Sequence, residues 1–73
     1  MDVTIRLSKL VQGELAHQPV ILTLKDLRHT MLVDFGFPPA KVDRICQQVI
    51  EKGRCSLTDL EDECNFLLER VSH

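Results

Sequence analysis

Phe35-Gly36-Phe37-Pro38-Pro39, residues 35–39, separates two stretches that have the apolar spacing of amphipathic helices. Glycine pays no Cβ penalty in the left-handed conformation that often ends a helix, so Gly36 is expected to end the first stretch. Proline suits the first turn of a helix, so the Pro38-Pro39 pair indicates that the second begins here. Two phenylalanines therefore flank a tight turn near the surface, where they either fill a small core or contact a partner.

The clearest predicted helix spans residues 39–52. Its apolar residues recur at i, i+3, i+4, i+7 and i+8, and they are Val42, Ile45, Cys46, Val49 and Ile50. Polar side chains fill the opposite face, and Gly53 suits the position that follows the last turn. We therefore expect this helix to bury one face.

Two further helices are predicted, one on each side. Thr23 resembles an N-cap for the first, whose apolar face comprises Leu24, Leu27, Met31, Leu32 and Phe35. The second spans about residues 58–71, because Thr58 and Glu61 form a capping-box pattern, although an overlapping pattern begins at Ser56. Its expected buried stripe comprises Leu60, Cys64, Leu67, Leu68 and Val71, with Phe66 beside it.

Residues 2–22 fit two patterns. Val3, Ile5 and Leu7 alternate as in a strand, whereas Val3, Leu7, Leu10, Val11 and Leu15 have helical spacing. We favour a helix over about 3–15 and a loop at 16–19, because a lone strand has nothing to pair with. The expected fold is all-α: a compact three-helix bundle over residues 24–73, preceded by an extension over 1–23 that carries an extra helix.

Composition excludes several classes of function. The chain has 73 residues and a net charge of -2, which fits one small domain with a marginal core. Its nine lysines and arginines are scattered, which argues against nucleic acid as the partner. Apolar runs are too short to span a membrane, and the beginning of the chain does not resemble a signal peptide. We expect a soluble protein of the cytoplasm or nucleus.

The residues that could carry chemistry are dispersed. His17, His29 and His73 are far apart, and the glycines do not form a phosphate-binding loop. Three cysteines without a CxxC pair suggest neither a disulfide framework nor a zinc site. Cys46 and Cys64 are expected to be buried, whereas Cys55 is expected in a loop, a position that permits exposure to solvent. We expect no enzyme activity, no metal and no cofactor.

The helices, the Phe35-Gly36-Phe37 turn and the Leu67-Leu68 pair together resemble a ubiquitin-associated (UBA) domain, over about residues 24–71. The long stretch between the turn and the leucine pair looks most like the UBA domains of inhibitor-of-apoptosis proteins. The resemblance implies a non-catalytic module that binds ubiquitin or a ubiquitin-like domain. Its site would comprise Phe35, Gly36 and Phe37 with Leu67 and Leu68, although Phe35 stands where the family most often has Met.

Two alternatives stand beside this interpretation. The same residues can be core: Phe35 lies on the apolar face of its helix, while Phe37 lies in a turn and is equally suited to a partner. Leu67 is expected in the core, and Leu68, about 100° further around the helix, is the better candidate for contact. The alternative function is a dimerisation or docking domain for another protein, including a component of a ubiquitin-pathway complex.

Replacement of Ile45 by alanine tests the predicted buried face of the 39–52 helix. We expect Ile45→Ala to lower the free energy of unfolding by about 2–5 kcal/mol, the usual loss for a buried aliphatic side chain. Urea denaturation monitored by circular dichroism measures this loss. A change below about 0.5 kcal/mol would assign Ile45 to the surface.

Overall fold

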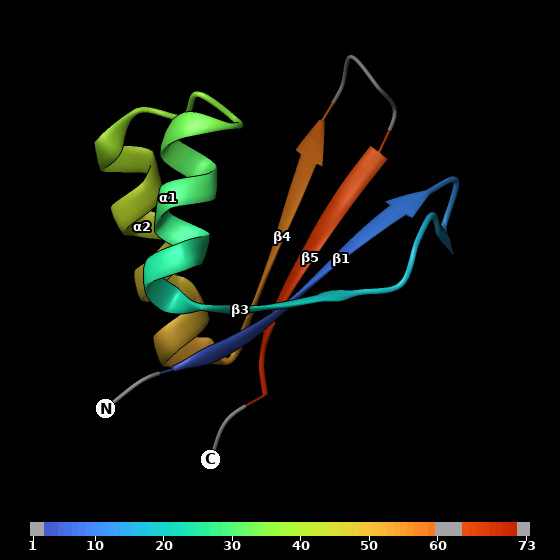
Figure 1. Ribbon diagram of the computed structural model, residues 1–73, viewed down its shortest axis with the longest axis horizontal. Helices are drawn as coiled ribbons and strands as arrows, with labels where there is room; N and C mark the ends of the chain where they lie inside the picture. Colours follow the sequence, from blue (N-terminus) through green and yellow to red (C-terminus); the bar gives the residue numbers. More distant parts are fainter. Residues whose placement is uncertain (1–2, 60–63, 72–73) are drawn as a thin grey trace.

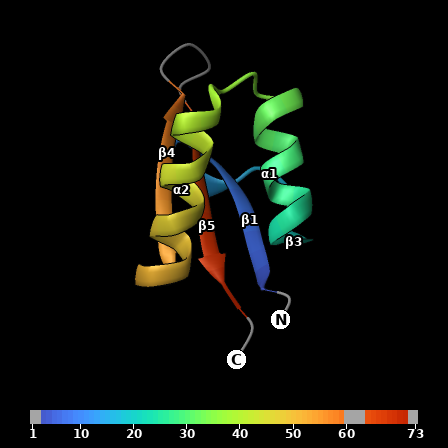
Figure 2. The ribbon, with the colours of Figure 1, turned by 90° about the vertical axis from the view of Figure 1, so that its left-hand side faces the viewer.

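Antiparallel strands replace the third helix and the N-terminal helix that the sequence pattern predicted. The computed structural model describes residues 3–59 and 64–71. Its elements are β1 (Thr4–Val11), β2 (Glu14–Leu15), β3 (Val20–Thr23), α1 (Leu24–Val33), α2 (Pro39–Lys52), β4 (Arg54–Asp59) and β5 (Cys64–Arg70). The two helices cover one face of a five-stranded sheet (Figures 1 and 2). The all-α prediction is therefore wrong, and the fold is a two-layer α/β sandwich.

The sheet is built around the pairing of β1 with β5. The strand order is β2-β1-β5-β4, and β3 also pairs with β1. On one side of β1, the Val3 carbonyl accepts a hydrogen bond from the Leu24 N–H at 3.0 Å, and the Lys9 carbonyl accepts one from the Ala16 N–H at 2.9 Å. On the other side, the Thr4 carbonyl accepts from the Val71 N–H at 2.9 Å. Hydrogen-bonding directions alternate along a strand, so β2 and β3 lie in line along one edge of β1 and β5 lies along the other.

The predicted helix over 3–15 is instead a β-hairpin. Gln12 and Gly13 form its turn with positive φ angles of 53° and 81°, and Val11 pairs with Glu14 across it. A two-residue turn of this kind needs positive φ at both central positions, and a glycine in the second lowers the strain. The strand-like alternation of Val3, Ile5 and Leu7 was therefore the informative pattern, and its partners are distant in sequence. The predicted loop at 16–19 is confirmed.

The predicted helix over 58–71 is also wrong, because this region contributes to the β4–β5 pair. Cys55 of β4 lies opposite Leu68 of β5, and Leu57 lies opposite Phe66. Side chains alternate between the two faces of a strand, so Leu67 and Leu68 face opposite sides of the sheet. The expected capping glutamate, Glu61, and the start of the apolar stripe at Leu60 lie outside the described residues.

The two remaining helix predictions are confirmed, with one shifted boundary. The α2 helix has the predicted bounds and ends at Gly53 in the left-handed conformation. The Thr23 hydroxyl caps α1 and accepts a hydrogen bond from the N–H of Asp26 at 3.1 Å. However, α1 ends at Val33 with Asp34 as its C-cap, so Gly36 lies beyond the cap in the connecting turn. The predicted extension of this helix to Phe35 is therefore too long.

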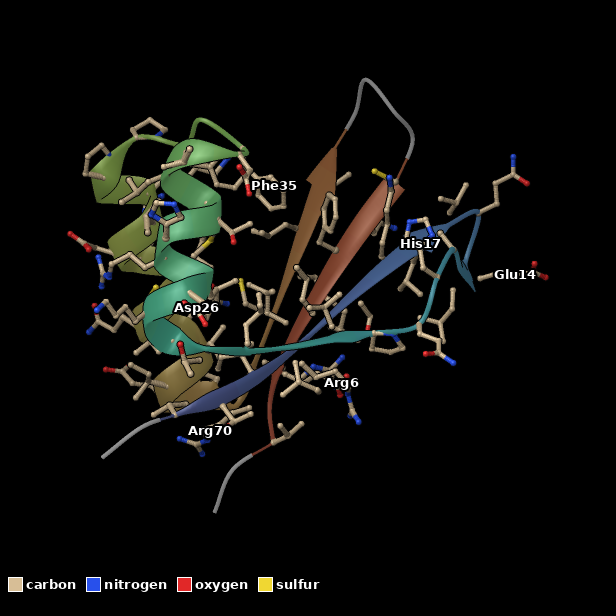
Figure 3. All side chains as sticks on the ribbon, in the orientation of Figure 1. Arg6, Glu14, His17, Asp26, Phe35 and Arg70 are labelled. Carbon is tan, nitrogen blue, oxygen red and sulfur yellow. The ribbon has the colours of Figure 1, made fainter. Side chains whose placement is uncertain are left out.

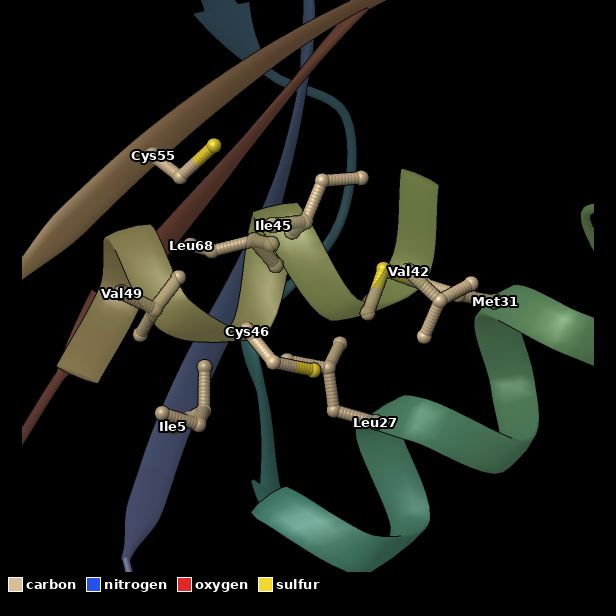
Figure 4. Packing of buried hydrophobic residues seen from close by; sticks show 9 residues of the cluster. All are labelled: Ile5, Leu27, Met31, Val42, Ile45, Cys46, Val49, Cys55 and Leu68. Atoms are coloured by element: carbon tan, nitrogen blue, oxygen red, sulfur yellow. The ribbon is translucent and has the colours of Figure 1, made fainter. Parts of the chain in front are cut away.

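The core lies between the helices and the sheet (Figure 4). Its buried residues come from both helices and from β1, β4 and β5: Ile5, Leu27, Met31, Val42, Ile45, Cys46, Val49, Cys55 and Leu68. Ile45 is 5 % exposed, as its place on the apolar face of α2 predicts. Cys46 and Cys64 are buried as expected. Cys55, expected in a loop, instead lies in β4, and it is buried because its side chain points toward α2.

Burial makes a testable prediction about the thiols. Desolvation by burial raises the pKa of both Cys46 and Cys55, so the native fold favours the neutral thiol. We therefore expect the free energy of unfolding to fall as the pH rises above about 8.5, where thiols of the unfolded chain ionise. Urea titrations across that range, compared with a Cys46→Ala, Cys55→Ala double variant, measure this loss. An equal pH dependence in both proteins would contradict it.

Candidate partner-binding groove

A groove opens between the α1–α2 turn and the outer part of the sheet. It has a volume of about 430 Å³, within the usual range of protein ligand sites. Three elements line it: the end and turn of the first helix, the first turn of α2, and the β4–β5 pair. The lining residues, which we call the phenylalanine groove, are Asp34, Phe35, Phe37, Lys41, Leu57, Thr58 and Phe66.

The three phenylalanines of the protein meet in this groove. The ring centre of Phe35 lies 5.5 Å from that of Phe37 in an edge-to-face arrangement, and 5.1 Å from that of Phe66. Such separations are typical of favourable aromatic pairs. Phe35 points from the turn after α1 toward the sheet (Figure 3), where its ring meets Phe66 of β5, so the turn is anchored on the sheet. All three rings are only half-buried, which leaves apolar surface at the mouth of the groove.

Two lysines stand over the aromatic surface. The ammonium nitrogen of Lys41 lies 4.0 Å from the ring centre of Phe37, and that of Lys9 lies 6.0 Å from the ring centre of Phe66. These are cation–π distances, and Lys41 has the closer contact. Among the described residues, the ion pairs are Arg6–Glu69 and Arg28–Asp43, so neither lysine is held by a carboxylate. The groove is thus aromatic at its floor, and its lining carries one cation, Lys41, and one carboxylate, Asp34.

The outer edge of β4 borders the groove. The Arg70 N–H donates to the Gly53 carbonyl at 2.9 Å, so this opposed pair is hydrogen-bonded. Bonded and non-bonded pairs alternate along an antiparallel ladder. The backbone N–H and C=O groups of Ser56 and Thr58 consequently point away from β5. Within the described part of the chain, β4 has no strand partner on that outer side, and Figure 2 shows it at the margin of the sheet.

The structure separates the residues that the sequence analysis grouped into one site. Phe35 and Phe37 line the groove, and Gly36 connects them with a φ of 68°. Leu68 lies on the helix side and is fully buried, so it is core rather than a contact residue. Leu67 faces the open side of the sheet, away from the phenylalanine groove, because it neighbours Leu68 on the same strand.

Sequence reasoning missed the contributions of the sheet to this groove. Phe66 was placed beside a helical stripe, and Leu57 was given no role. The signal that identifies them is alternation, because Cys55 and Leu57 on β4 and Cys64, Phe66 and Leu68 on β5 occupy every second position. These residues belong to one face only if the two segments are strands.

The described residues provide no cluster of metal ligands. They contain no group of three or more His, Cys, Asp and Glu side chains that could hold a metal ion. None of their buried side-chain nitrogen or oxygen atoms lacks a hydrogen-bond partner. No helix in 3–59 or 64–71 is long and apolar enough to span a membrane.

Comparison with known proteins assigns no family. No family model matches the chain, and no curated protein or solved structure shows significant similarity to it.

Replacement of Phe37 by alanine tests whether its ring is surface or core. We expect Phe37→Ala to remain folded and to lose about 1–3 kcal/mol of unfolding free energy, less than the roughly 3–5 kcal/mol typical of a fully buried phenylalanine. Urea denaturation measures the loss. Val33→Ala, at a side chain that is 62 % exposed, is the control and should change stability by less than about 0.5 kcal/mol. An unfolded Phe37→Ala variant would place Phe37 in the core.

Proposed function

We propose that this protein is a non-catalytic interaction module that binds an extended segment of a partner protein along β4. The observation that carries the proposal is the position of the phenylalanine groove directly beside the outer edge of that strand. An edge strand offers main-chain hydrogen bonds, and an adjoining apolar pocket selects a side chain of the added strand.

The backbone of β4 is suited to strand addition. The N–H and C=O groups of Ser56 and Thr58 are directed outward by the register with β5. An added segment would pair with these groups and continue the sheet. Because this part of the interaction is made by the main chain, it supplies affinity with little dependence on the partner's sequence.

The phenylalanine groove supplies the selectivity. Its half-buried rings provide apolar surface for one large aliphatic or aromatic side chain of the added segment. The ammonium group of Lys41, which lines the groove, lies over the Phe37 ring and has no carboxylate partner among the described residues. An acidic residue next to the apolar anchor would complement Lys41. We therefore infer a partner segment that combines an apolar anchor with negative charge.

The ubiquitin-binding prediction rested on a different geometry. It required Leu67 and Leu68 on the last helix beside the turn, whereas they face opposite sides of a strand here. Nothing in the fold supports that shared surface, and the partner proposed here is an extended peptide rather than the apolar patch of a folded domain.

Selection from a display library of random 12-residue peptides tests the proposal. We expect enriched peptides to share a large apolar residue with acidic neighbours. Binding of the best peptide should shift the amide NMR signals of Phe37, Ser56, Thr58 and Phe66. Ser56→Pro removes one outward N–H without removing a bond to β5, and it should weaken binding about five- to tenfold.

Ser56→Ala is the matched control, because it changes the same side chain and keeps the backbone N–H. It should bind the peptide as the wild-type protein does. Circular dichroism establishes that both variants are folded. Equal peptide affinity in Ser56→Pro and Ser56→Ala, amide shifts confined to residues away from the groove, or no enrichment of any sequence would overturn the proposal.

A further inference from the structure

The opposite edge of the sheet has a different character. It is formed in part by β3, Val20-Ile21-Leu22-Thr23, which contains no charged residue. Val20 is 52 % exposed and Ile21 is 58 % exposed. Natural proteins protect an edge strand with charge, a bulge, a cover, short length or proline. β3 has short length and the neighbouring Pro19 but no charge, so its exposed apolar side chains indicate a surface that pairs with another strand.

The register of β3 determines which of its backbone groups face outward. The Leu24 N–H donates to the Val3 carbonyl at 3.0 Å, so this opposed pair is hydrogen-bonded. By alternation, Leu22 and Val20 bond toward β1, whereas Ile21 and Thr23 direct their N–H groups away from the sheet. The carbonyl of Thr23 is used differently, because Thr23 is the N-cap of α1 and its C=O accepts the first bond of that helix.

This pattern is complementary to itself. If two β3 strands pair antiparallel about a two-fold axis at Ile21, the two Ile21 residues exchange both of their outward hydrogen bonds. Thr23 then lies opposite Pro19 of the second copy and donates its N–H to that carbonyl. The reverse bond, from the Pro19 nitrogen to the Thr23 carbonyl, is not needed, because proline has no N–H and the Thr23 carbonyl already accepts a hydrogen bond within α1. In this pairing, each outward backbone N–H and C=O group of Ile21 and Thr23 therefore takes part in a hydrogen bond.

The side chains support the same arrangement on both faces. Ile21 meets its own copy on the open face of the sheet, where neighbouring Arg6 is already paired with Glu69 at 3.3 Å. Val20 lies opposite Leu22 of the second copy on the helix side. The contact is apolar on both faces and brings no like charges of β3 together.

We propose that β3 is a homodimerisation edge, and that two copies of this chain join through it into one continuous sheet with a two-fold axis at Ile21. Closed two-fold contacts use the same surface on both copies, as this edge does. The pairing leaves β4 and the phenylalanine groove at the outer margins of the joined sheet. It is therefore independent of the peptide-binding function proposed above.

Sedimentation equilibrium over a range of concentrations up to about 1 mM measures the association. We expect the apparent mass to approach twice the 8.4 kDa of the monomer. Ile21→Lys places two ammonium groups against each other and removes apolar contact from both copies, so it should raise the dissociation constant at least about tenfold. Ile50→Lys introduces the same charge on α2, away from β3, at a side chain that is 38 % exposed although its spacing predicted burial, and it should leave the association unchanged. Thermal unfolding shows that both variants are folded.

Amide hydrogen exchange supplies a second measurement that locates the contact. Protection of the Ile21 and Thr23 N–H groups should increase with protein concentration in the wild-type protein and not in Ile21→Lys. A monomeric mass at every concentration would overturn the proposal. So would a dimer that Ile21→Lys leaves intact, or one that Ile50→Lys weakens equally.

Discussion

The antiparallel ladder between β1 and β5 is the interaction on which the rest of the structure depends. It joins seven residue pairs, from Ile5 with Arg70 to Val11 with Cys64. Every other strand attaches to one side of this pair, and both helices pack against the face that carries Ile5 and Leu68. Because the two strands are distant in sequence, their pairing has a large loop-closure cost that only the burial of the shared core can offset.

The parts of the fold that were predictable from sequence are those governed by local interactions. The α2 helix followed from apolar spacing and its flanking proline and glycine, and α1 followed from the Thr23 cap. The strands were not predicted, because a strand is stabilised by a partner that its own sequence does not specify. Helical spacing in the last segment was coincidental, since Leu67 and Leu68 lie on opposite faces.

The candidate site likewise combines residues that local sequence identifies with residues that only strand pairing brings together. Phe35 and Phe37 could be recognised as functional candidates because a short turn displays them on its own. Leu57 and Phe66 could not be recognised in that role, because they reach the groove only when β4 and β5 pair. Only the residues contributed by the local turn could therefore be predicted from the sequence, whereas those contributed by the sheet could not.

The beginning of β1 lies beside the end of β5, since the Val71 N–H donates to the Thr4 carbonyl at 2.9 Å. This placement has a mechanical consequence. Tension applied through residues 3 and 71 would pull β1 and β5 apart at one end of the ladder, so that its hydrogen bonds break one after another. Strands sheared along their length would instead share the load. The same central pairing that organises the fold thus leaves it weak against a pull from its two ends.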